Sequence, residues 1–421
     1  MTSKMDKTTL HQVIIEQREM FKVKKDYVER KIPEQTISSE KIIVITGIRR
    51  CGKSTLLKQL AKKYEHHAYI NFEDERLLNF SHEDFKTLLE IFIQDDPDIK
   101  TLFFDEIQNV FGWEKFVRRL FTEGYKIFVT GSNARLLSSE IATSLTGRNM
   151  TVRLYPFTFI EFLAFNNFPQ KDIFTTKERA ALATHLSDYL TFGGMPEIVK
   201  SRNLEELSQI YRDILVKDLL VRFKIRDAKD FRELSLYLLS NVSSRISYNN
   251  LKNMLEFSAT SKVKKYVDYL IEAYLFYTIP KFDYSIKKQI VNDKKVYAAD
   301  TGMINATGFA FTKNTGQVIE NAVFLELLGR GKEIYYHQSD RECDFLIRKG
   351  RNIVSAVQVT TTLEDPKTRQ REIEGLHSAM QAHKLDHGTI IIADGEERTM
   401  EGNRKIKVIP LWKVLLGHDE L

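Results

Sequence analysis

A glycine-rich loop between a strand and a helix constrains this chain more than any other feature of its sequence. The β-branched run Lys41–Thr46 predicts a buried strand, and helix-forming residues follow at 54–60. The loop reads G-x-x-x-x-G-K-S, a motif that holds phosphate groups when it connects a strand to a helix. It comprises Gly47, Ile48, Arg49, Arg50, Cys51, Gly52, Lys53, Ser54 and Thr55. The sequence therefore predicts a nucleoside triphosphate site.

The residues of this loop suit the phosphate chain of a nucleotide. Gly47 and Gly52 allow the backbone to turn so that successive N–H groups point at an anion. The helix N-terminus adds its positive dipole end, Lys53 is placed to reach the β- and γ-phosphates, and the Ser54 hydroxyl is placed to ligate Mg²⁺. We therefore expect a triphosphate and Mg²⁺ as ligands.

Strands and helices alternate after the loop. Further strands are expected at 68–72, 101–105, 125–130 and 151–154, with helices between most of them. Alternation of this kind predicts a parallel sheet that is covered by helices on both faces, and hence an α/β fold.

Two acids end the third of these strands. Asp105 and Glu106 follow Leu102-Phe103-Phe104, at the carboxyl end of a strand expected beside the loop. There Asp105 would hold Mg²⁺ together with Ser54, and Glu106 would act as the general base that polarises the attacking water. A charged strand end without a further role is the alternative, and the loop upstream favours the catalytic interpretation.

Two more residues are candidates for contacts with the γ-phosphate. Ser132 follows the fourth strand, where it would touch the phosphate or orient the water, unless it only caps a helix. Arg148 precedes the fifth strand and is a candidate transition-state cation, delivered from a neighbouring subunit. A surface arginine, or one paired with a carboxylate, is the alternative for Arg148.

These motifs together resemble a large prokaryotic group of AAA-type ATPases. The resemblance is carried by the loop, Phe103-Phe104-Asp105-Glu106-Ile107-Gln108, Thr130-Gly131-Ser132, Gly147-Arg148, Tyr155-Pro156-Phe157-x-Phe159-x-Glu161-Phe162, Gly193-Gly194-Met195-Pro196, Glu320-Asn321 and Glu342-x-Asp344-Phe345. It implies a sheet of the ASCE P-loop type, a helical lid, and ATP rather than GTP. It also strengthens the expectation that Arg148 acts between the subunits of a homo-oligomer.

Two amphipathic helices at 247–256 and 261–273 predict a helix-turn-helix. Its second helix begins with Lys262, Lys264 and Lys265, and a basic strand pair that resembles the wing of a winged helix follows. That strand pair carries Lys281, Lys287, Lys288, Lys294 and Lys295. Lysines in these places, above all Lys262, Lys264, Lys265, Lys287 and Lys288, would neutralise DNA phosphates. Protein contacts, with the lysines simply solvated, are the alternative.

The last part of the chain resembles the PD-(D/E)XK nuclease fold. Glu320 and Asp344 match acids of that motif, but Gln358 and Thr360 stand where a second acid and usually a lysine are needed. A neutral amide is a weak metal ligand, and Thr360 carries no charge. We therefore expect a nuclease-like fold that has kept its shape without DNA cleavage.

The length of the chain allows several domains. We expect an N-terminal helical segment at 1–36, the ATPase core at 37–156, a helical lid at 157–228, a winged-helix domain at 229–304 and a nuclease-like domain at 305–421. The two cysteines form neither a disulfide framework nor a metal-finger spacing, and the sequence predicts neither a signal peptide nor a membrane span. These features favour a cytoplasmic protein.

The leading hypothesis is an AAA-type motor or remodelling factor that binds DNA and hydrolyses ATP at intersubunit sites. Two alternatives stay open. One is a nucleotide-switched signalling or defence regulator with protein partners, and the other is an ATP-gated, metal-dependent DNA nuclease. The net charge of +6, from 63 basic and 57 acidic residues, is only a weak indication of an anionic partner.

Overall fold

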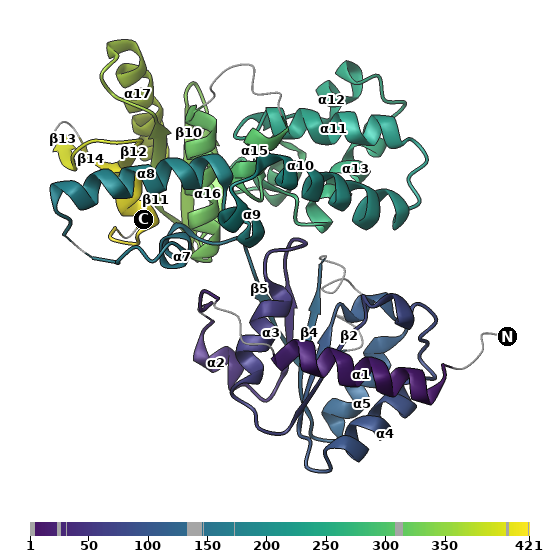
Figure 1. Ribbon diagram of the computed structural model, residues 1–421. Coiled ribbons are helices and arrows are strands. Elements are labelled where there is room, and N and C mark those ends of the chain that lie inside the picture. Colours follow the sequence, from purple (N-terminus) through teal and green to yellow (C-terminus); the bar gives the residue numbers. More distant parts are fainter. Residues whose placement is uncertain are drawn as a thin grey trace. The chain divides into compact units, whose positions relative to one another are not determined.

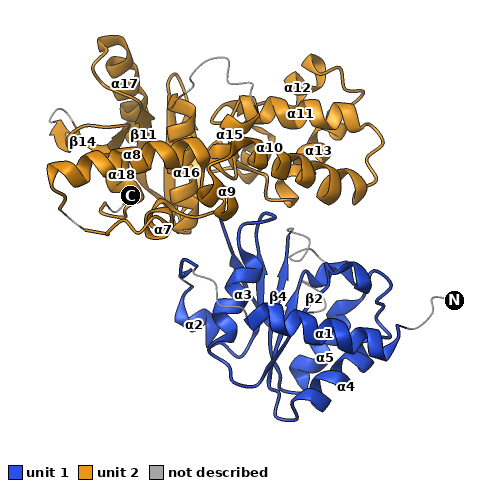
Figure 2. Cartoon of the chain, viewed as in Figure 1, with its two compact units in different colours: residues 1–155 blue, residues 156–421 orange. Residues whose placement is uncertain are grey.

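The chain forms two compact units, 1–155 and 156–421, which Figure 2 colours separately. The computed structural model describes residues 5–22, 27–30, 32–132, 145, 147–171, 173–307, 315–400, 404–419 and 421. Each unit contains its own cluster of buried apolar side chains. Within the described residues, no helix has the length and apolar character needed to cross a lipid bilayer.

A parallel sheet lies at the centre of the first unit (Figure 1). Its strands are β1 (Ile42–Thr46), β2 (His67–Asn71), β3 (Thr101–Asp105), β4 (Lys126–Gly131) and β5 (Asn149–Arg153). They lie in the order β2-β3-β4-β1-β5, and every neighbouring pair is parallel. β4 lies between the loop-bearing β1 and the acid-bearing β3. The α/β expectation is confirmed for this unit.

Helices pack on both faces of this sheet. They are α1 (Lys7–Lys22), α2 (Glu34–Ile37), α3 (Lys53–Ala61), α4 (Phe85–Asp95) and α5 (Trp113–Thr122), with short 3-10 turns at Glu75–Leu77 and Ile107–Asn109. Side chains of α4 and α5 share a core with Leu102 and Phe104 of β3. Residues alternate between the two faces of a strand, so Phe103 points to the opposite face, where Tyr64 after α3 meets its ring.

The second unit begins with helices. These are α7 (Phe159–Phe165), α8 (Thr176–Phe192), α9 (Pro196–Ser201) and α10 (Leu204–Asp213), which continues into a π-helix at Ile214–Val221. A later helix, α15 (Thr301–Ala306), packs against α8 and α10.

A buried carboxylate holds the turn between α8 and α9. The two oxygens of Asp300 accept hydrogen bonds from the backbone N–H groups of Gly194 (2.7 Å) and Gly302 (2.9 Å). Gly193 has a φ of +77°, and a Cβ at this residue would lie 1.8 Å from an oxygen of Asp300. A Cβ at Gly194 would lie 2.2 Å from the carbonyl oxygen of Phe157. Glycine is therefore needed at both positions of this turn between helices.

A three-stranded module follows. It consists of α11 (Ala228–Ser240), β6 (Arg245–Ile246), α12 (Tyr248–Met254), α13 (Thr260–Glu272), β7 (Phe276–Pro280), α14 (Ile286–Val291) and β8 (Lys294–Ala298). The strands form an antiparallel sheet in the order β6-β8-β7. The expected strand pair is present, but Lys287 and Lys288 lie on the short helix α14 between its strands. Ser285 caps this helix, since its hydroxyl accepts from the N–H of Lys288.

A six-stranded domain ends the chain. It consists of α16 (Thr315–Gly329), β9 (Glu333–Gln338), β10 (Glu342–Lys349), β11 (Asn352–Thr360), α17 (Pro366–His383), β12 (His387–Ile392), β13 (Arg398–Met400), β14 (Lys405–Pro410) and α18 (Leu411–Leu415). The strand order is β13-β14-β12-β11-β10-β9, with parallel pairing from β11 through β12 to β14 and antiparallel pairing elsewhere.

Candidate nucleotide site

The glycine-rich loop joins the carboxyl end of β1 to the start of α3. A Cβ at Gly47 would lie 2.1 Å from the carbonyl oxygen of Leu154, so only glycine permits this approach to the chain that follows β5. Gly52 has a φ of +103° directly before α3, and Arg50 also has a positive φ of +66°. Left-handed residues next to right-handed ones turn consecutive N–H groups toward one point, which suits an anion.

Among the other loop residues, Ile48 and Cys51 are buried, whereas Arg49 and Thr55 are only partly covered. Ile48 and Cys51 are fully buried, and burial raises the pKa of the Cys51 thiol. Arg49 forms an ion pair with Glu73, which lies after β2. Thr55 is half-buried in the first turn of α3. Cys51 is therefore a packing residue in its neutral thiol form rather than a reactive one.

Lys53 lies at the centre of the loop and is almost completely buried. Its ammonium group donates to the carbonyl oxygens of Gly47 and Ile48, each at 3.3 Å, and lies 3.4 Å from a carboxylate oxygen of Glu106. Burial acts to lower the pKa of Lys53, but the nearby negative charges, with that of Glu106 the largest, together outweigh it and hold the pKa above its ordinary value. Lys53 therefore supplies a fixed positive charge inside the loop.

Asp105 lies beside the loop at the end of β3 and has no exposed surface. It accepts hydrogen bonds from the hydroxyl groups of Tyr69 (3.0 Å), Thr130 and Ser54. Burial and the neighbouring charge of Glu106 raise the pKa of Asp105. The contact between the Ser54 hydroxyl and the Asp105 carboxylate brings together two hard oxygen ligands, the donor set that Mg²⁺ prefers.

Glu106 turns away from β3 in a left-handed conformation with a φ of +50°. Its backbone N–H donates to the Thr130 hydroxyl oxygen at 2.9 Å, and its carboxylate accepts from the Gln108 side chain. Burial acts to raise the pKa of Glu106, but the Lys53 ammonium group and the Gln108 hydrogen bond outweigh it and hold the pKa below its ordinary value. Glu106 is therefore a carboxylate, the form that a general base requires.

Ser132 and Arg148 lie at opposite ends of the strands of the sheet: Ser132 at the carboxyl ends, where the loop begins, and Arg148 at the amino ends. Thr46 pairs with Gly131, so Ser132 follows β4 at the edge that carries the loop, and it is buried. Ile42 at the start of β1 donates its N–H to the carbonyl oxygen of Arg148 at 2.9 Å. The length of β1 separates the Arg148 backbone from its own loop by roughly 15–20 Å. Arg148 therefore lies away from the site of its own chain.

Three residues to which the sequence analysis gave no role also contact this site. Thr130 bonds to both Asp105 and Glu106, and Tyr69 supports Asp105 from β2. The Arg30 side chain donates to the carbonyl oxygens of Cys51 (3.3 Å) and Tyr155 (2.6 Å), so it ties the loop to the last residue of the first unit. The strand-end position of Thr130 was a usable signal. Arg30 and Tyr69 had no local signal, because their partners are distant in sequence.

The lysines predicted to contact DNA differ in their surroundings. Lys262 lies 2.7 Å from a carboxylate oxygen of Asp227 and 3.0 Å from one of Asp230, so acids of its own chain compensate its charge. The other four, Lys264, Lys265, Lys287 and Lys288, have exposed side chains on α13 and α14. Lys288 also lies 3.6 Å from Asp283. The structure thus leaves a smaller exposed basic set than the sequence suggested.

Comparison with protein families identifies two regions of the chain. Residues 39–163 match an AAA domain, and residues 183–314 match a domain of unknown function, DUF8612. The first match contains the whole glycine-rich loop, the acid pair and the strands that carry them.

Similar chains occur in archaea and bacteria. The uncharacterized protein MJ1544 of Methanocaldococcus jannaschii is 37% identical over 434 residues, which cover 98% of this chain and 96% of that protein. An uncharacterized protein of Haemophilus influenzae is 32% identical over 354 residues, which cover 80% of this chain and 86% of that protein.

Solved structures show distant resemblances. The Walker-type ATPase PABY2304 of Pyrococcus abyssi is 14% identical with a TM-score of 0.35, covering 72% of this chain and 96% of that one. The ORC1 protein of Aeropyrum pernix in complex with DNA is 13% identical with a TM-score of 0.30, covering 68% and 95%. The family assignment depends instead on the domain match and the two relatives. This chain belongs to the same family as MJ1544 and its Haemophilus influenzae relative, and its residues 39–163 form a P-loop domain of the AAA type.

Proposed function

We propose that this protein hydrolyses ATP with Mg²⁺ at the loop 47–55 and uses the turnover to move or remodel DNA. The observation that carries the ATPase part is the convergence of Lys53, Asp105 and Glu106 beside the loop. A fixed cation, a buried carboxylate with a hydroxyl partner and an ionised acid are the parts that phosphoryl transfer to water requires.

Each of these residues has a distinct role in the proposal. Lys53 and the loop N–H groups bind the β- and γ-phosphates, and Glu106 accepts the proton of the attacking water. Ser54 and Asp105 would hold the Mg²⁺ ion, which would neutralise phosphate charge. Thr130 keeps the two acids at the edge of the sheet, and Ser132 at the same edge contacts the γ-phosphate.

We further propose that the active form is a homo-oligomer. The position of Arg148 at the far edge of its own sheet supports this, because Arg148 is too distant to stabilise charge on its own nucleotide. Delivered to the site of a neighbouring subunit, the guanidinium would stabilise the charge that develops on the transferred phosphoryl group.

The DNA part of the proposal is supported by the element order of the three-stranded module. The order α11, β6, α12, α13, β7 and β8 is that of a winged helix, with α13 in the place of the reading helix and the short helix α14 inserted between β7 and β8. Lys264, Lys265, Lys287 and Lys288 are the proposed phosphate contacts. The order α16-β9-β10-β11-α17-β12 likewise supports the nuclease-like assignment of the six-stranded domain. We also propose the domain boundaries expected from the sequence, namely 1–36, 37–156, 157–228, 229–304 and 305–421.

A second candidate function is a nucleotide-switched regulator with a protein partner. Large apolar side chains lie exposed around α14, namely Tyr284, Ile286, Ile290 and Val291. Exposed apolar groups that lie together favour protein contacts over DNA contacts. A partner that binds this protein, and that is lost from the Lys53→Ala variant, would support this function instead.

The test of the motor proposal is ATP turnover with and without DNA. We expect duplex, single-stranded or branched DNA to raise turnover, and the Lys264→Glu/Lys265→Glu variant to lose that stimulation while basal turnover persists. Lys367→Glu, at an exposed lysine on α17, is the matched control. Binding should weaken with salt, and less steeply once these lysines are removed. If no DNA binds at low salt and none stimulates turnover, the DNA part of the proposal is wrong.

A further inference from the structure

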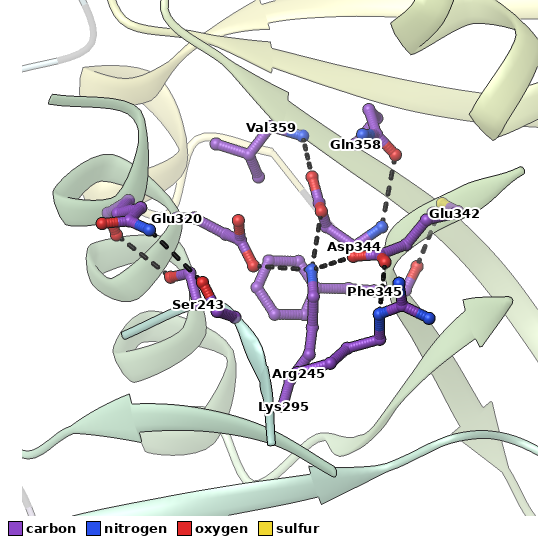
Figure 3. A network of polar contacts seen from close by, with 12 residues as sticks. Ser243, Arg245, Lys295, Glu320, Glu342, Asp344, Phe345, Gln358 and Val359 are labelled. Atoms are coloured by element: carbon purple, nitrogen blue, oxygen red, sulfur yellow. Dashed lines mark hydrogen bonds and ion pairs between the residues drawn. The ribbon is translucent and has the colours of Figure 1, made fainter. Parts of the chain in front are cut away.

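A buried lysine occupies the centre of an acidic cluster in the second unit. The Lys295 ammonium group lies 2.8 Å from an oxygen of Asp344, 3.0 Å from one of Glu320 and 2.9 Å from one of Glu342. Figure 3 shows Lys295 between Glu320 and Asp344, with dashed lines to both. The cluster lies at a cavity of about 1000 Å³, which Glu320, Glu342 and Asp344 help to line.

Lys295 is a permanent cation in this position. The residue is 1% exposed. Burial alone would lower its pKa, but the charges of Asp344 and Glu320 outweigh burial and hold the pKa of Lys295 well above its ordinary value. The ammonium group keeps its proton beside these acids, while burial and the charge of Asp344 raise the pKa of Glu320 to about 8.

The polar groups around this cluster are also hydrogen-bonded to one another. The second oxygen of Asp344 accepts from the Val359 N–H at 2.9 Å. The side-chain oxygen of Gln358 accepts from the Asp344 N–H at 3.2 Å, and its amide donates to Glu372. Gln358 therefore directs its oxygen at the backbone, where it is unable to serve as a metal ligand.

The residues here do not fit the divalent metal that an active nuclease of this fold requires. A metal would need the carboxylates that already surround the lysine, and an ammonium group at the same point would repel it. Among the described residues, no group of three or more His, Cys, Asp or Glu side chains is arranged to hold a metal ion. The place of the cation is taken by Lys295.

We propose that Lys295 is the resident cation of this carboxylate cluster in place of a divalent metal, and that it joins the three-stranded module to the six-stranded domain. Lys295 comes from β8, whereas Glu320 comes from α16, and Glu342 and Asp344 come from β10. One side chain thus compensates acids from two elements of the neighbouring domain. This inference concerns a different site from the proposed ATPase centre, and it stands whether or not that centre hydrolyses ATP.

The test counts the Mn²⁺ ions bound per full-length chain in nucleotide-free buffer, by the loss of the free-ion electron paramagnetic resonance signal. Wild type and Asp344→Asn should bind equally, because wild type has no metal at this cluster. Lys295→Met should bind one ion more than wild type, and the extra ion should be lost from Lys295→Met/Asp344→Asn. The adjacent Lys294→Met is the matched control and should behave as wild type.

Two outcomes would overturn the proposal. Fewer ions on Asp344→Asn than on wild type would show that wild type already holds a metal at the cluster. A folded Lys295→Met chain that gains no ion would show that the lysine does not occupy a cation site. If Lys295→Met does not fold, the comparison of wild type with Asp344→Asn decides, because equal binding supports the proposal and unequal binding contradicts it.

Discussion

The ammonium group of Lys53 lies 3.4 Å from a carboxylate oxygen of Glu106, with the two side chains 3% and 12% exposed. Each charge is therefore compensated by the other inside the loop and strand end that carry them. Removing one partner of a buried pair leaves the other charge uncompensated, which costs more than the net value of the pair. Lys53 and Glu106 are thus coupled in stability as well as in the proposed chemistry.

Lys53→Met removes a phosphate contact and also leaves Glu106 buried without its partner. We expect ATP turnover to fall at least about 100-fold. The free energy of unfolding of the first unit should fall by about 3–5 kcal/mol. Phosphate release and urea denaturation measure the two effects, with Lys86→Met, at an exposed lysine on α4, as the control. Turnover equal to that of the control would contradict the assignment.

Thr130→Val should separate the two acids, because the Thr130 hydroxyl bonds to both Asp105 and the Glu106 backbone. Valine has the same shape without the hydroxyl, so the buried Glu106 N–H loses its acceptor and Asp105 loses one of its three hydroxyl donors. Leaving a buried polar group unpaired costs about 1–3 kcal/mol. We expect lower kcat and lower stability, and we expect Thr130→Ser to restore both. If the Val and Ser variants behave alike in both assays, the bridging role of the hydroxyl is wrong.

If Arg148 acts on the nucleotide of a neighbouring subunit, the Arg148→Ala variant should lose ATP turnover. An equimolar mixture of Arg148→Ala chains and Lys53→Met chains should then regain activity, because some sites combine an intact loop from one chain with Arg148 from the other. Phosphate release by the mixture, compared with each variant alone, measures this. A mixture no more active than the average of its components would argue against shared sites.

Asp300 should make the stability of the second unit depend on pH. Burial raises its pKa from 3.8 to about 6, against the opposing effect of the hydrogen bonds from Gly194 and Gly302. The folded state then binds the proton more tightly than the unfolded state, so this group's contribution is fully present below about pH 4 and is lost as pH rises through 6. The contribution is on the order of 3 kcal/mol.

The measurement for Asp300 is urea unfolding of wild type and Asp300→Asn between pH 4 and 7.5. The stability of wild type relative to the variant should decrease as pH rises across this range. A difference that stays constant with pH would mean that the pKa of Asp300 is not raised in the folded protein.

Features with local causes were predictable from the sequence. The loop, β1, β3 and the acid pair lie in short segments whose apolar runs and glycines determine their structure, so the parallel sheet and the position of Asp105 followed from pattern alone. The turn at Gly193 and Gly194 was likewise predictable. Its cause, the carboxylate of Asp300, was not, because the two segments are about a hundred residues apart in sequence.

Features with distant causes were not predictable. Lys295 belonged to a basic stretch that indicated an exposed wing, yet it is buried, because the acids that surround it come from α16 and β10. Lys262 was expected to be available to DNA, yet Asp227 and Asp230 compensate it. In each case the sequence showed that a stretch of the chain is basic. It did not show which acids, distant in sequence, surround the lysine in the folded protein.

In the proposed reaction, Glu106 activates the water that hydrolyses ATP at this loop. The most direct test of this claim is Glu106→Gln, an isosteric change that removes the base, with Glu90→Gln at an exposed acid on α4 as control. We predict that kcat falls by about 10²–10⁴ while the affinity for ATP is retained. Turnover at the level of the Glu90→Gln control, in a folded Glu106→Gln protein that binds ATP, would contradict the claim.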